Sequence, residues 1–375
     1  MKNVKLKSKI KTWRKVKLEK VVDIVYGKDL PTRELKNQGF PVYGGNGIIG
    51  YSDKYLYDEP QIIVGCRGAY SGNVFETKPK SFITHNSLIL QLKNSNSIDR
   101  KFLFYKLLKA NIKSTITGSA QPQITITELN QLEIATPNIE KQKRIAKILS
   151  AFDEKIELNN KINQTLEEMA QTIFKEWLSK NQKLNIKNQK LGDLMSLRKE
   201  KFKKYEEWKN LKLLDLGRFP QKSLAITTYG KGEEIKTAGI KFKNGDILFG
   251  AVRPYFHKVV IAPFDGVTNS SVFVIMPKKE NHYALLITIL FSENTINYTS
   301  MCASGTKMPV LKWEDLCNME VLIPGDKVID NFNKRVKNFY DLIVKNALEN
   351  QKLAALRDLL LPKLMSGEIL VNSEE

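Results

Sequence analysis

The sequence predicts an α+β protein with two modules, each built on a curved and mostly antiparallel sheet, and two long helices that join the modules as an antiparallel coiled coil with a pseudo-twofold axis. Three observations predict this fold class. Part of the first half of the chain recurs in the second half, each copy contains a long amphipathic stretch, and the residues before each stretch alternate short apolar runs with turn residues.

The repeat is clearest between residues 117–166 and 304–353, which match without gaps at a constant shift of 187 positions. Identical pairs at this shift include Gly118 and Gly305, Pro122 and Pro309, Leu129 and Leu316, Glu133 and Glu320, Pro137 and Pro324, and Phe152 and Phe339. A single register over this length, with a period of about half the chain, indicates a duplicated domain rather than a solenoid.

The repeat predicts four segments: a first module over residues 1–137, a first helix over 138–182, a second module over 183–324 and a second helix over 325–368. The modules match each other more weakly than the helices do. Aligning Thr84–Ser87 with Thr268–Ser271 makes His85 equivalent to Asn269. Residues 202–226 show little of the glycine-rich pattern of Pro41–Gly50, so we expect the two modules to differ in this part.

Short runs of β-branched and aromatic residues, bounded by Gly, Pro, Asn and Asp, predict the strands of the two modules. The expected strands are Gln61–Val64, Phe82–Leu92, Ile124–Ile126, Gly245–Phe249, Lys258–Ala262 and Ser271–Met276. Longer apolar patterns predict few helices within the modules, and the examples are Arg100–Ile112 and Tyr283–Phe291.

The stretch Gly45–Gly50 spells G-x-G-x-x-G, which is the dinucleotide-binding pattern when it follows a buried strand and opens a helix. Here Pro41 suits an edge strand, and the residues from Tyr51 to Pro60 have the composition of strand and turn. The acidic residue expected about 20 positions later is replaced by Tyr70. These features favour a glycine-rich turn between strands. The alternative is an autonomous nucleotide-binding enzyme that uses this loop.

Each long helix is predicted from its apolar spacing. Ile139 to about Lys180 contains no glycine or proline, and its apolar residues recur in steps of three and four, as in the seam of a coiled coil. A helix of about 40 residues spans roughly 60 Å and cannot bury its apolar stripe alone. In the second copy, Pro362 is expected to disturb the last turns and Gly367 suits a C-terminal cap.

The helical seam carries two asparagines in each copy of the repeat, Asn159 and Asn163 in the first and Asn346 and Asn350 in the second. A buried asparagine lowers stability but fixes register and orientation, because its amide must find a partner. We therefore expect these four residues to set the register of the helix pair. The alternative is that they face solvent.

The composition points to a polyanionic partner. The 375 residues include 60 Lys plus Arg against 40 Asp plus Glu, which gives a net charge of +20. Nucleic acid is the commonest partner of so basic a protein, although the abundance of Lys, Ile and Asn would also follow from a low-GC genome. The three cysteines lack C-x-x-C spacing and no secretory signal precedes them, so we expect reduced thiols, a cytoplasmic location and no metal site.

The module loops gather side chains that suit DNA, because Arg reads guanine, Asn and Gln read adenine, and Lys binds phosphate. The candidates are Lys28, Asn46, Arg67, Tyr70, His85, Asn86 and Gln121 in the first module, and Lys222, Arg253, Tyr255, His257, Lys258, Asn269 and Lys307 in the second. A structural role competes for each one. Arg67 and Arg253, for example, each follow a predicted buried strand, where a salt bridge is the alternative.

The chain shows no motif of a DNA amino-methyltransferase, a P-loop ATPase or a nuclease. In its order of segments it resembles the specificity (S) subunit of type I restriction–modification systems over nearly its whole length. The resemblance is carried by Phe40–Gly50, Thr117–Gln123, Ile139–Leu149, Gly245–Gly250, Arg253–Lys258 and Leu359–Ile369.

The resemblance implies that each module is a target-recognition domain that reads one half of a bipartite site in double-stranded DNA. It also implies that the helices set the length of the unread gap between the two half-sites and dock two methyltransferase (M) subunits. Two restriction (R) subunits would complete the complex, and no membrane is expected as a partner. By the same resemblance, this chain is no enzyme and binds no cofactor, and its partner subunits use S-adenosylmethionine, ATP and Mg²⁺. Neither the DNA sequence nor the length of the gap follows from the residues.

Overall fold

The computed structural model describes residues 13–118, 121–180, 187–202, 205–235, 239–369 and 371, and its contacts divide the chain into two units. Unit 1 comprises Met1–Asp153 and Leu356–Glu375, and unit 2 comprises Glu154–Ala355. Each unit therefore holds one module together with parts of both long helices. The predicted segment boundaries, which treat each helix as a segment of its own, stay a prediction.

Unit 1 is built on a four-stranded antiparallel sheet with the order β2-β8-β5-β6 and a smaller sheet with the order β4-β3-β7, in which β3 and β7 are parallel. The strands are β1 (Arg14–Lys17), β2 (Val22–Tyr26), β3 (Phe40–Gly44), β4 (Gly47–Ser52), β5 (Ile62–Gly65), β6 (Val74–Glu76), β7 (Phe82–Ile83), β8 (Ser87–Leu92) and β9 (Glu133–Thr136), and β1 pairs with β9. Helix α1 (Arg100–Lys109) buries Phe102 and Leu103 in one core with Ile62 and Leu88 of the large sheet.

Unit 2 has a four-stranded antiparallel sheet with the order β11-β18-β15-β16 and a second sheet with the order β13-β12-β17-β14. The strands are β10 (Lys187–Lys190), β11 (Met195–Leu197), β12 (Lys212–Leu213), β13 (Gly230–Lys231), β14 (Ile240–Phe242), β15 (Ile247–Gly250), β16 (Val259–Ile261), β17 (Gly266–Thr268), β18 (Val272–Pro277) and β19 (Glu320–Ile323). Its shorter helices are α4 (Tyr283–Leu290), α5 (Glu293–Cys302) and α6 (Trp313–Cys317), and α4 is almost wholly buried.

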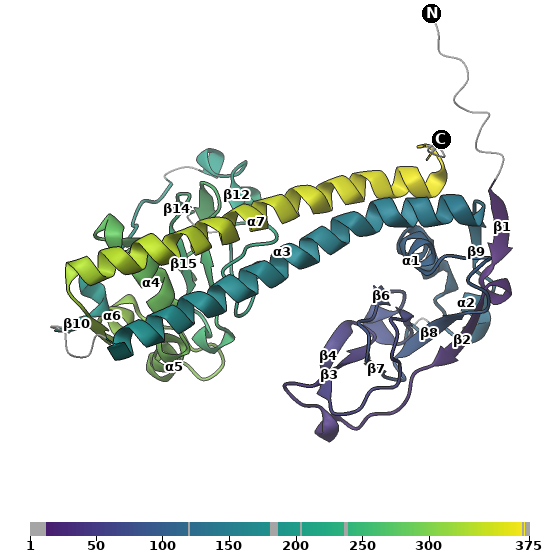
Figure 1. Cartoon of the computed structure of the whole chain (residues 1–375), viewed down its shortest axis with the longest axis horizontal. Coiled ribbons are helices and arrows are strands. Elements are labelled where there is room, and N and C mark those ends of the chain that lie inside the picture. The colour runs from purple at the N-terminus through teal and green to yellow at the C-terminus, as the bar shows by residue number, and fades with distance from the viewer. Residues whose placement is uncertain are drawn as a thin grey trace, which may run out of the picture. The chain divides into compact units, whose positions relative to one another are not determined.

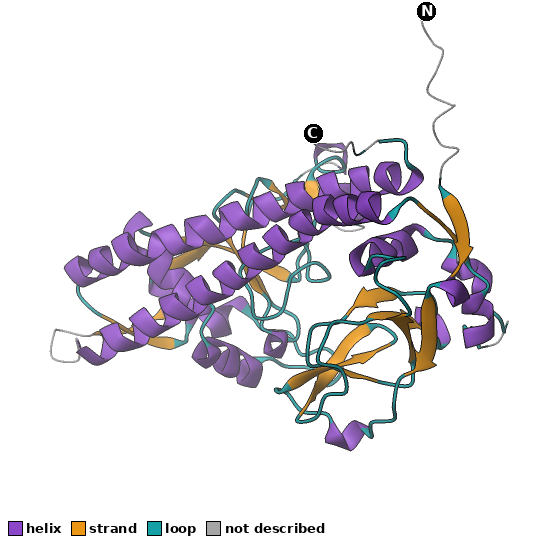
Figure 2. Cartoon of the chain, turned by 45° about the vertical axis from the view of Figure 1, so that its right-hand side comes forward, coloured by secondary structure: helices purple, strands orange, loops and turns teal. Residues whose placement is uncertain are grey.

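The large sheets of the two modules share one strand order. Figure 2 shows the strands in orange and the helices in purple. The large sheets correspond strand for strand, and each small sheet contains one parallel pair, β3 with β7 in unit 1 and β12 with β17 in unit 2. The pairs β1–β9 and β10–β19 also correspond. The small sheet recurs in unit 2 although residues 202–226 lack the glycine-rich pattern, because a two-residue strand such as Lys212–Leu213 carries little sequence signal.

The long helices are α3 (Ile139–Lys180) and α7 (Asp326–Ser366), which Figure 1 draws as continuous rods. Within unit 2 they run antiparallel, since Asn159 bonds to Asn350 while Asn163 bonds to Asn346. Further along, the rings of Phe174 and Trp177 pack on Phe332, with centroids 5.9 and 5.3 Å apart. The predicted antiparallel pairing and α+β class are confirmed.

All four seam asparagines are buried, as predicted. Asn159 Nδ2 donates to Asn350 Oδ1 at 2.8 Å, and Asn350 Nδ2 donates to Asn160 Oδ1 at 2.9 Å. One helical turn away, Asn346 Nδ2 donates to Asn163 Oδ1 at 2.8 Å. A slip of one turn could keep only one of these pairs: it would place Asn159 opposite Asn346 but Asn163 opposite Leu342, so the full set of hydrogen bonds selects a single register. The alternative in which they face solvent is wrong.

Two predicted elements of the modules differ in the structure. Residues 124–126 are not a strand, because the Thr125 hydroxyl accepts from the Glu128 amide at 3.3 Å and caps α2 (Ile126–Asn130). Helix α5 was not expected, since its polar sequence has only a weak apolar stripe. Its start is explained by the N-cap Ser292, whose Oγ accepts from the Thr295 amide at 3.2 Å.

Pro362 does not end α7, which continues to Ser366. The expected disturbance is outweighed by packing, because Leu361, Leu364 and Met365 are buried in the core of unit 1 and hold the last turns in place. Gly367 then takes φ +77°, and its amide bonds to the Leu364 carbonyl at 3.3 Å, which confirms the predicted glycine cap.

Replacing Asn346 by Leu should destabilise the chain by about 1–3 kcal/mol, because Asn163 would lose its partner while 2% exposed. The double variant Asn163→Leu/Asn346→Leu should recover most of that loss, because no buried amide is then left unpaired. Urea unfolding of both variants measures the difference. Gln164→Leu, at the exposed neighbouring position, is the control. A double variant less stable than the single one would contradict this account of the seam.

Candidate nucleic-acid interface

In unit 1, three loops meet at the residue that follows the central strand β5. The Cys66 amide donates to the Asn86 carbonyl at 2.9 Å, and the Cys66 carbonyl accepts from the Ile124 amide at 3.0 Å. The Gly68 amide donates to the Pro122 carbonyl at 2.8 Å. Three segments far apart in sequence are thus joined by main-chain bonds. Together with the neighbouring residues 45–46 they form one loop cluster, defined here as residues 45–46, 66–73, 86, 117–118 and 121–123.

The glycine-rich stretch forms part of this cluster. Gly44 pairs with Gly47 across a tight turn that joins β3 to β4, and Gly47 has φ +89°. A Cβ added at Gly65 would lie 2.5 Å from the carbonyl oxygens of both Gly45 and Tyr70, so only glycine permits this approach. No helix follows the turn, so the alternative of a dinucleotide-binding loop is wrong and the β-turn prediction is confirmed.

The loop cluster brings together five of the seven residues predicted in the first module: Asn46, Arg67, Tyr70, Asn86 and Gln121. Tyr70 is 50% exposed, and Arg67 and Gln121 are also exposed. Among the described residues Arg67 makes no ion pair, so the structural salt bridge considered for it does not occur.

The two remaining residues, His85 and Lys28, adjoin the cluster. The His85 amide donates to the Lys28 carbonyl at 3.1 Å, and His85 Nδ1 lies 2.6 Å from the Asp29 carboxylate. The exposed Lys28 ammonium is thus held beside the loops, while the imidazole of His85 already has an acidic partner. All seven residues predicted in the first module therefore lie on or beside one surface.

Unit 2 repeats the same hydrogen bonds around Ala251. The Ala251 amide donates to the Ser271 carbonyl at 2.9 Å, and the Ala251 carbonyl accepts from the Leu311 amide at 2.8 Å. The Arg253 amide donates to the Pro309 carbonyl at 2.8 Å, as Gly68 does to Pro122 in unit 1. The loop cluster of unit 2 is thus residues 251–258, 269–271 and 304–310. The duplicated scaffold was not evident from the weak match between the modules.

A short 3₁₀ turn has the same form in both clusters. In unit 1, Gly68–Tyr70 is bounded by Gly68 at φ +68° and Gly72 at φ +92°. In unit 2, Pro254–Phe256 is bounded by Arg253 and His257, both at φ +51°. Non-glycine residues rarely adopt this conformation, so the scaffold imposes it on them. Tyr70 and the equivalent Tyr255 are 50% and 51% exposed.

The hydrogen bonds correct one predicted equivalence. The Ser87 amide bonds to the Thr84 carbonyl at 3.0 Å, and the Val272 amide bonds to the Asn269 carbonyl at 3.2 Å. Asn269 therefore corresponds to Thr84 and not to His85. The sequence alignment was wrong by one residue because it matched two identical threonines across loops of different length.

Of the residues predicted in the second module, three are exposed, three (Arg253, Lys258 and Asn269) are half-buried, and His257 is buried. Lys222, Tyr255 and Lys307 are exposed, and Arg253 Nη2 donates to the Lys307 carbonyl at 3.0 Å. Lys222 also pairs with Glu293 at 3.1 Å. No acidic partner of Arg253 is found among the described residues, so the salt bridge considered there does not occur either.

One residue predicted as a DNA contact in the second module does not reach the surface. His257 is 4% exposed, and its Nε2 lies 3.0 Å from the Phe291 carbonyl. Burial lowers the pKa of this imidazole, so it stays neutral inside the module and its prediction as a DNA contact is wrong. Lys258 donates to the Leu216 carbonyl, and Asn269 Oδ1 accepts from the Ser271 amide at 3.0 Å. These two side chains serve the turns that hold the cluster.

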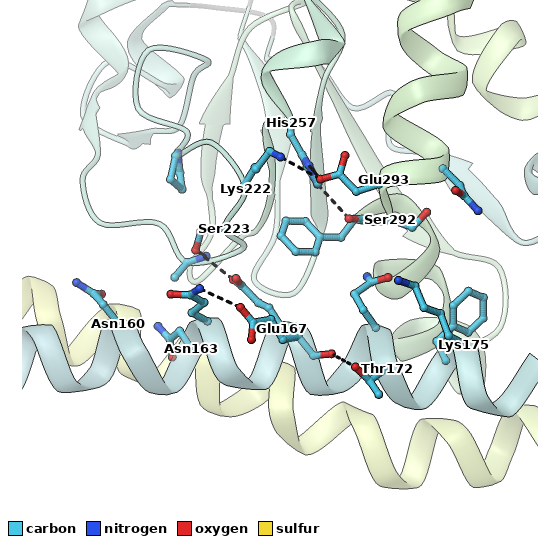
Figure 3. A pocket seen from close by; sticks show the side chains of 18 of the residues that line it. Asn160, Asn163, Glu167, Thr172, Lys175, Lys222, Ser223, His257, Ser292 and Glu293 are labelled. Atoms are coloured by element: carbon cyan, nitrogen blue, oxygen red, sulfur yellow. Dashed lines mark hydrogen bonds and ion pairs between the residues drawn. The ribbon is translucent and has the colours of Figure 1, made fainter. Parts of the chain in front are cut away.

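A pocket in unit 2 lies between α3 and the loops of the second module (Figure 3). Glu167 reaches from α3 and accepts from the Leu224 amide at 2.7 Å and from Ser223 Oγ at 3.1 Å. Burial raises the pKa of this carboxyl to about 7, against the hydrogen bonds, which lower it. The sequence analysis missed Glu167. Its repeat partner at the shift of 187 is the apolar Ala354, and that difference could have identified it.

With the geometry of both clusters established, comparison with known proteins identifies the family. The family described as the type I restriction modification DNA specificity domain matches residues 10–168. The type I restriction enzyme MjaIX specificity subunit of Methanocaldococcus jannaschii is 26% identical over 329 residues, covering 78% of this chain and 74% of that protein. The HindI specificity subunit of Haemophilus influenzae is 24% identical over 361 residues, covering 74% and 79%.

Residues 10–168 belong to the family of type I DNA specificity domains, and the chain as a whole is similar to type I restriction enzyme specificity subunits. A solved structure supports the fold: the type I system S subunit from M. genitalium has a TM-score of 0.63 and 19% identity, covering 96% of this chain and 98% of that one. Among the described residues of this specificity subunit, no helix is long and apolar enough to span a bilayer, and no three His, Cys, Asp or Glu side chains gather as a metal site would require.

The Glu167 carboxyl should make the stability of the chain depend on pH. Its folded-state pKa of about 7 lies above the ordinary 4.5, so the folded chain binds the proton more tightly than the unfolded chain does. Its contribution is present below pH 4.5 and is lost as the pH rises through 7. Glu167→Gln should therefore reduce the fall in unfolding free energy between about pH 5 and 8 by on the order of 1–3 kcal/mol.

Urea unfolding at several pH values measures this effect. Glu168→Gln, at the exposed neighbouring position, serves as the matched control and should keep most of the pH dependence, because its charge raises the pKa of Glu167 less than burial does. Equal pH profiles for the wild type and Glu167→Gln would show that the buried carboxyl is not the titrating group.

Proposed function

We propose that this specificity subunit reads a bipartite sequence in double-stranded DNA, with one loop cluster on each half-site. The observation that carries the proposal is the duplicated scaffold, in which Cys66 and Ala251 hold equivalent loops by equivalent main-chain bonds. A duplicated surface with different side chains suits two half-sites of different sequence. The exposed cations beside the clusters, among them Lys28, Arg67 and Lys307, suit the phosphates that flank each half-site.

The proposal assigns the helices two roles. Helices α3 and α7 would set the length of the unread gap, and their outer faces would dock two methyltransferase subunits. The locked register of the seam supports the first role, because the asparagine pairs allow one alignment of the helices. Two restriction subunits would complete the complex. The chain itself is proposed to have no catalytic role and no cofactor of its own, while the partner subunits use S-adenosylmethionine, ATP and Mg²⁺.

The test is the motif that is methylated when the chain is combined with its methyltransferase subunits. We expect two short conserved blocks separated by a constant number of unread base pairs, as determined by methylation sequencing of randomised DNA. Binding of the same complex should weaken steeply with salt, because phosphate contacts release counterions. A single continuous motif, or DNA binding that is insensitive to salt, would overturn the proposal and favour a protein-interaction adaptor whose charge is incidental.

The gap role has its own test. Deleting about four residues from α3, one turn or roughly 6 Å of helix, should shorten the unread gap by about one to two base pairs. The two conserved blocks should stay the same, since the loop clusters are untouched. The motif of the deletion variant is read by the same sequencing assay. A gap of unchanged length in an active complex would show that the helices do not set it.

A further inference from the structure

We infer that the two half-sites are read by different chemistry at one equivalent hairpin of each loop cluster, by amide side chains in unit 1 and by apolar side chains in unit 2. The inference rests on the proposed function and names the base contact that it requires. It assigns Gln121 to an adenine in one half-site, and Met308 with Val310 to a thymine methyl group in the other.

The two hairpins are equivalent by their main-chain bonds. Thr117 bridges Gln123 in unit 1, and Ser304 bridges Val310 in unit 2. Each hairpin also bridges the residue after the strand end, Arg67 with Gln123 and Val252 with Val310. At the shift of 187 that relates the hairpins, Gln121 corresponds to Met308 and Gln123 to Val310.

The turn of each hairpin confirms this equivalence. Gly118 and Gly305 both have positive φ, +83° and +121°. A Cβ added at Gly118 would lie 2.5 Å from the Gln121 carbonyl oxygen, and one added at Gly305 would lie 2.9 Å from the Met308 carbonyl oxygen. Both hairpins therefore have a glycine with positive φ at one position and a close approach to the carbonyl three residues later, and the described residues differ in the side chains that they present.

The apolar side chains of the hairpin in unit 2 are exposed. Met308 is 59% exposed and Val310 is 41% exposed, while Tyr255, on the neighbouring turn, is 51% exposed. Arg253 ties that turn to the hairpin through the Lys307 carbonyl, at 3.0 Å. Exposed apolar groups on a surface usually mark a contact site, and here the guanidinium of Arg253 and the ammonium of Lys307 stand beside them.

That combination fits the major groove of a DNA duplex better than it fits another protein surface. Thymine is the base that presents a methyl group in the major groove, and apolar side chains recognise it there. The adjacent cations suit the phosphates on either side. In unit 1, Gln121 and Gln123 are exposed at the equivalent positions, and a glutamine amide matches the donor and acceptor of adenine.

Reciprocal variants test the inference in the complex with the methyltransferase subunits. Met308→Gln should change base preference at one or two adjacent positions of one half-site only, and Gln121→Met should do the same in the other half-site. Each variant is the control for the other, since each leaves one half of the motif intact. The loss of preference should be about 5- to 150-fold at the affected position.

A second measurement removes the thymine methyl itself. Replacing thymine by uracil, one position at a time, in the half-site altered by Met308→Gln should weaken wild-type binding about fourfold at one position, the value of one buried methyl group. Binding by the Met308→Gln complex should not respond to that replacement. If this variant has a lowered melting temperature, Met308→Ala, which adds no polar atom, takes its place in both measurements.

The outcomes separate the inference from the proposed function. A wild-type complex without a two-part motif would refute the proposed function. A two-part motif that neither variant alters would overturn the inference alone. So would an altered half-site that contains no thymine sensitive to uracil, and so would a Met308→Gln variant that fails to bind the methyltransferase subunits, since the patch would then be a protein contact.

Discussion

The architecture of both modules depends on the peptide groups of a single buried residue, Cys66 in unit 1 and Ala251 in unit 2. Its amide bonds to one loop and its carbonyl to another, so three distant segments converge where the central strand ends. A buried main-chain group must find a partner, and here the partners are the loops themselves. The small side chains of Cys66 and Ala251 leave room for that convergence, which explains why neither position holds a large residue.

Because main-chain groups make these bonds, the exposed side chains of the loops are free to differ. The turn that carries Tyr70 uses glycines to reach positive φ, while the turn that carries Tyr255 reaches the same conformation with Arg253 and His257. The strain of those two residues is offset by interactions that the glycines cannot make. The His257 ring bonds to the Phe291 carbonyl, and the Arg253 guanidinium bonds to the Lys307 carbonyl. One scaffold can therefore present two unrelated surfaces.

The sequence predicted the features that repeat over long distances and missed those decided by local packing. The repeat period of 187 residues and the glycine-free run to Lys180 were sufficient to predict the duplicated modules, the antiparallel helices and the buried asparagines. Each of these predictions rests on a pattern shared by many residues. The exclusion of the nucleotide-binding loop also followed from local composition. In contrast, the burial of His257 depends on its packing against the ring and carbonyl of Phe291, a contact distant in sequence that no local pattern predicts. The equivalence of Asn269 with Thr84 depends on main-chain bonds that no side chain reveals.

The polar groups in the helical seam show how unit 2 couples its helices to its module. An apolar seam would bind the helices at least as tightly, but it would also tolerate a slip by one turn. The two asparagine pairs together disfavour that slip, because it would keep only one of them. Glu167, one turn further along α3, bonds to the main chain of the module at Leu224. One face of α3 thus holds α7 in position and also holds the module loop around Leu224, which borders the pocket. A buried carboxyl whose pKa is raised to about 7 lowers the stability of the folded chain near neutral pH. Its presence at this position is explained by the alignment of α3 with the module, which its hydrogen bonds impose.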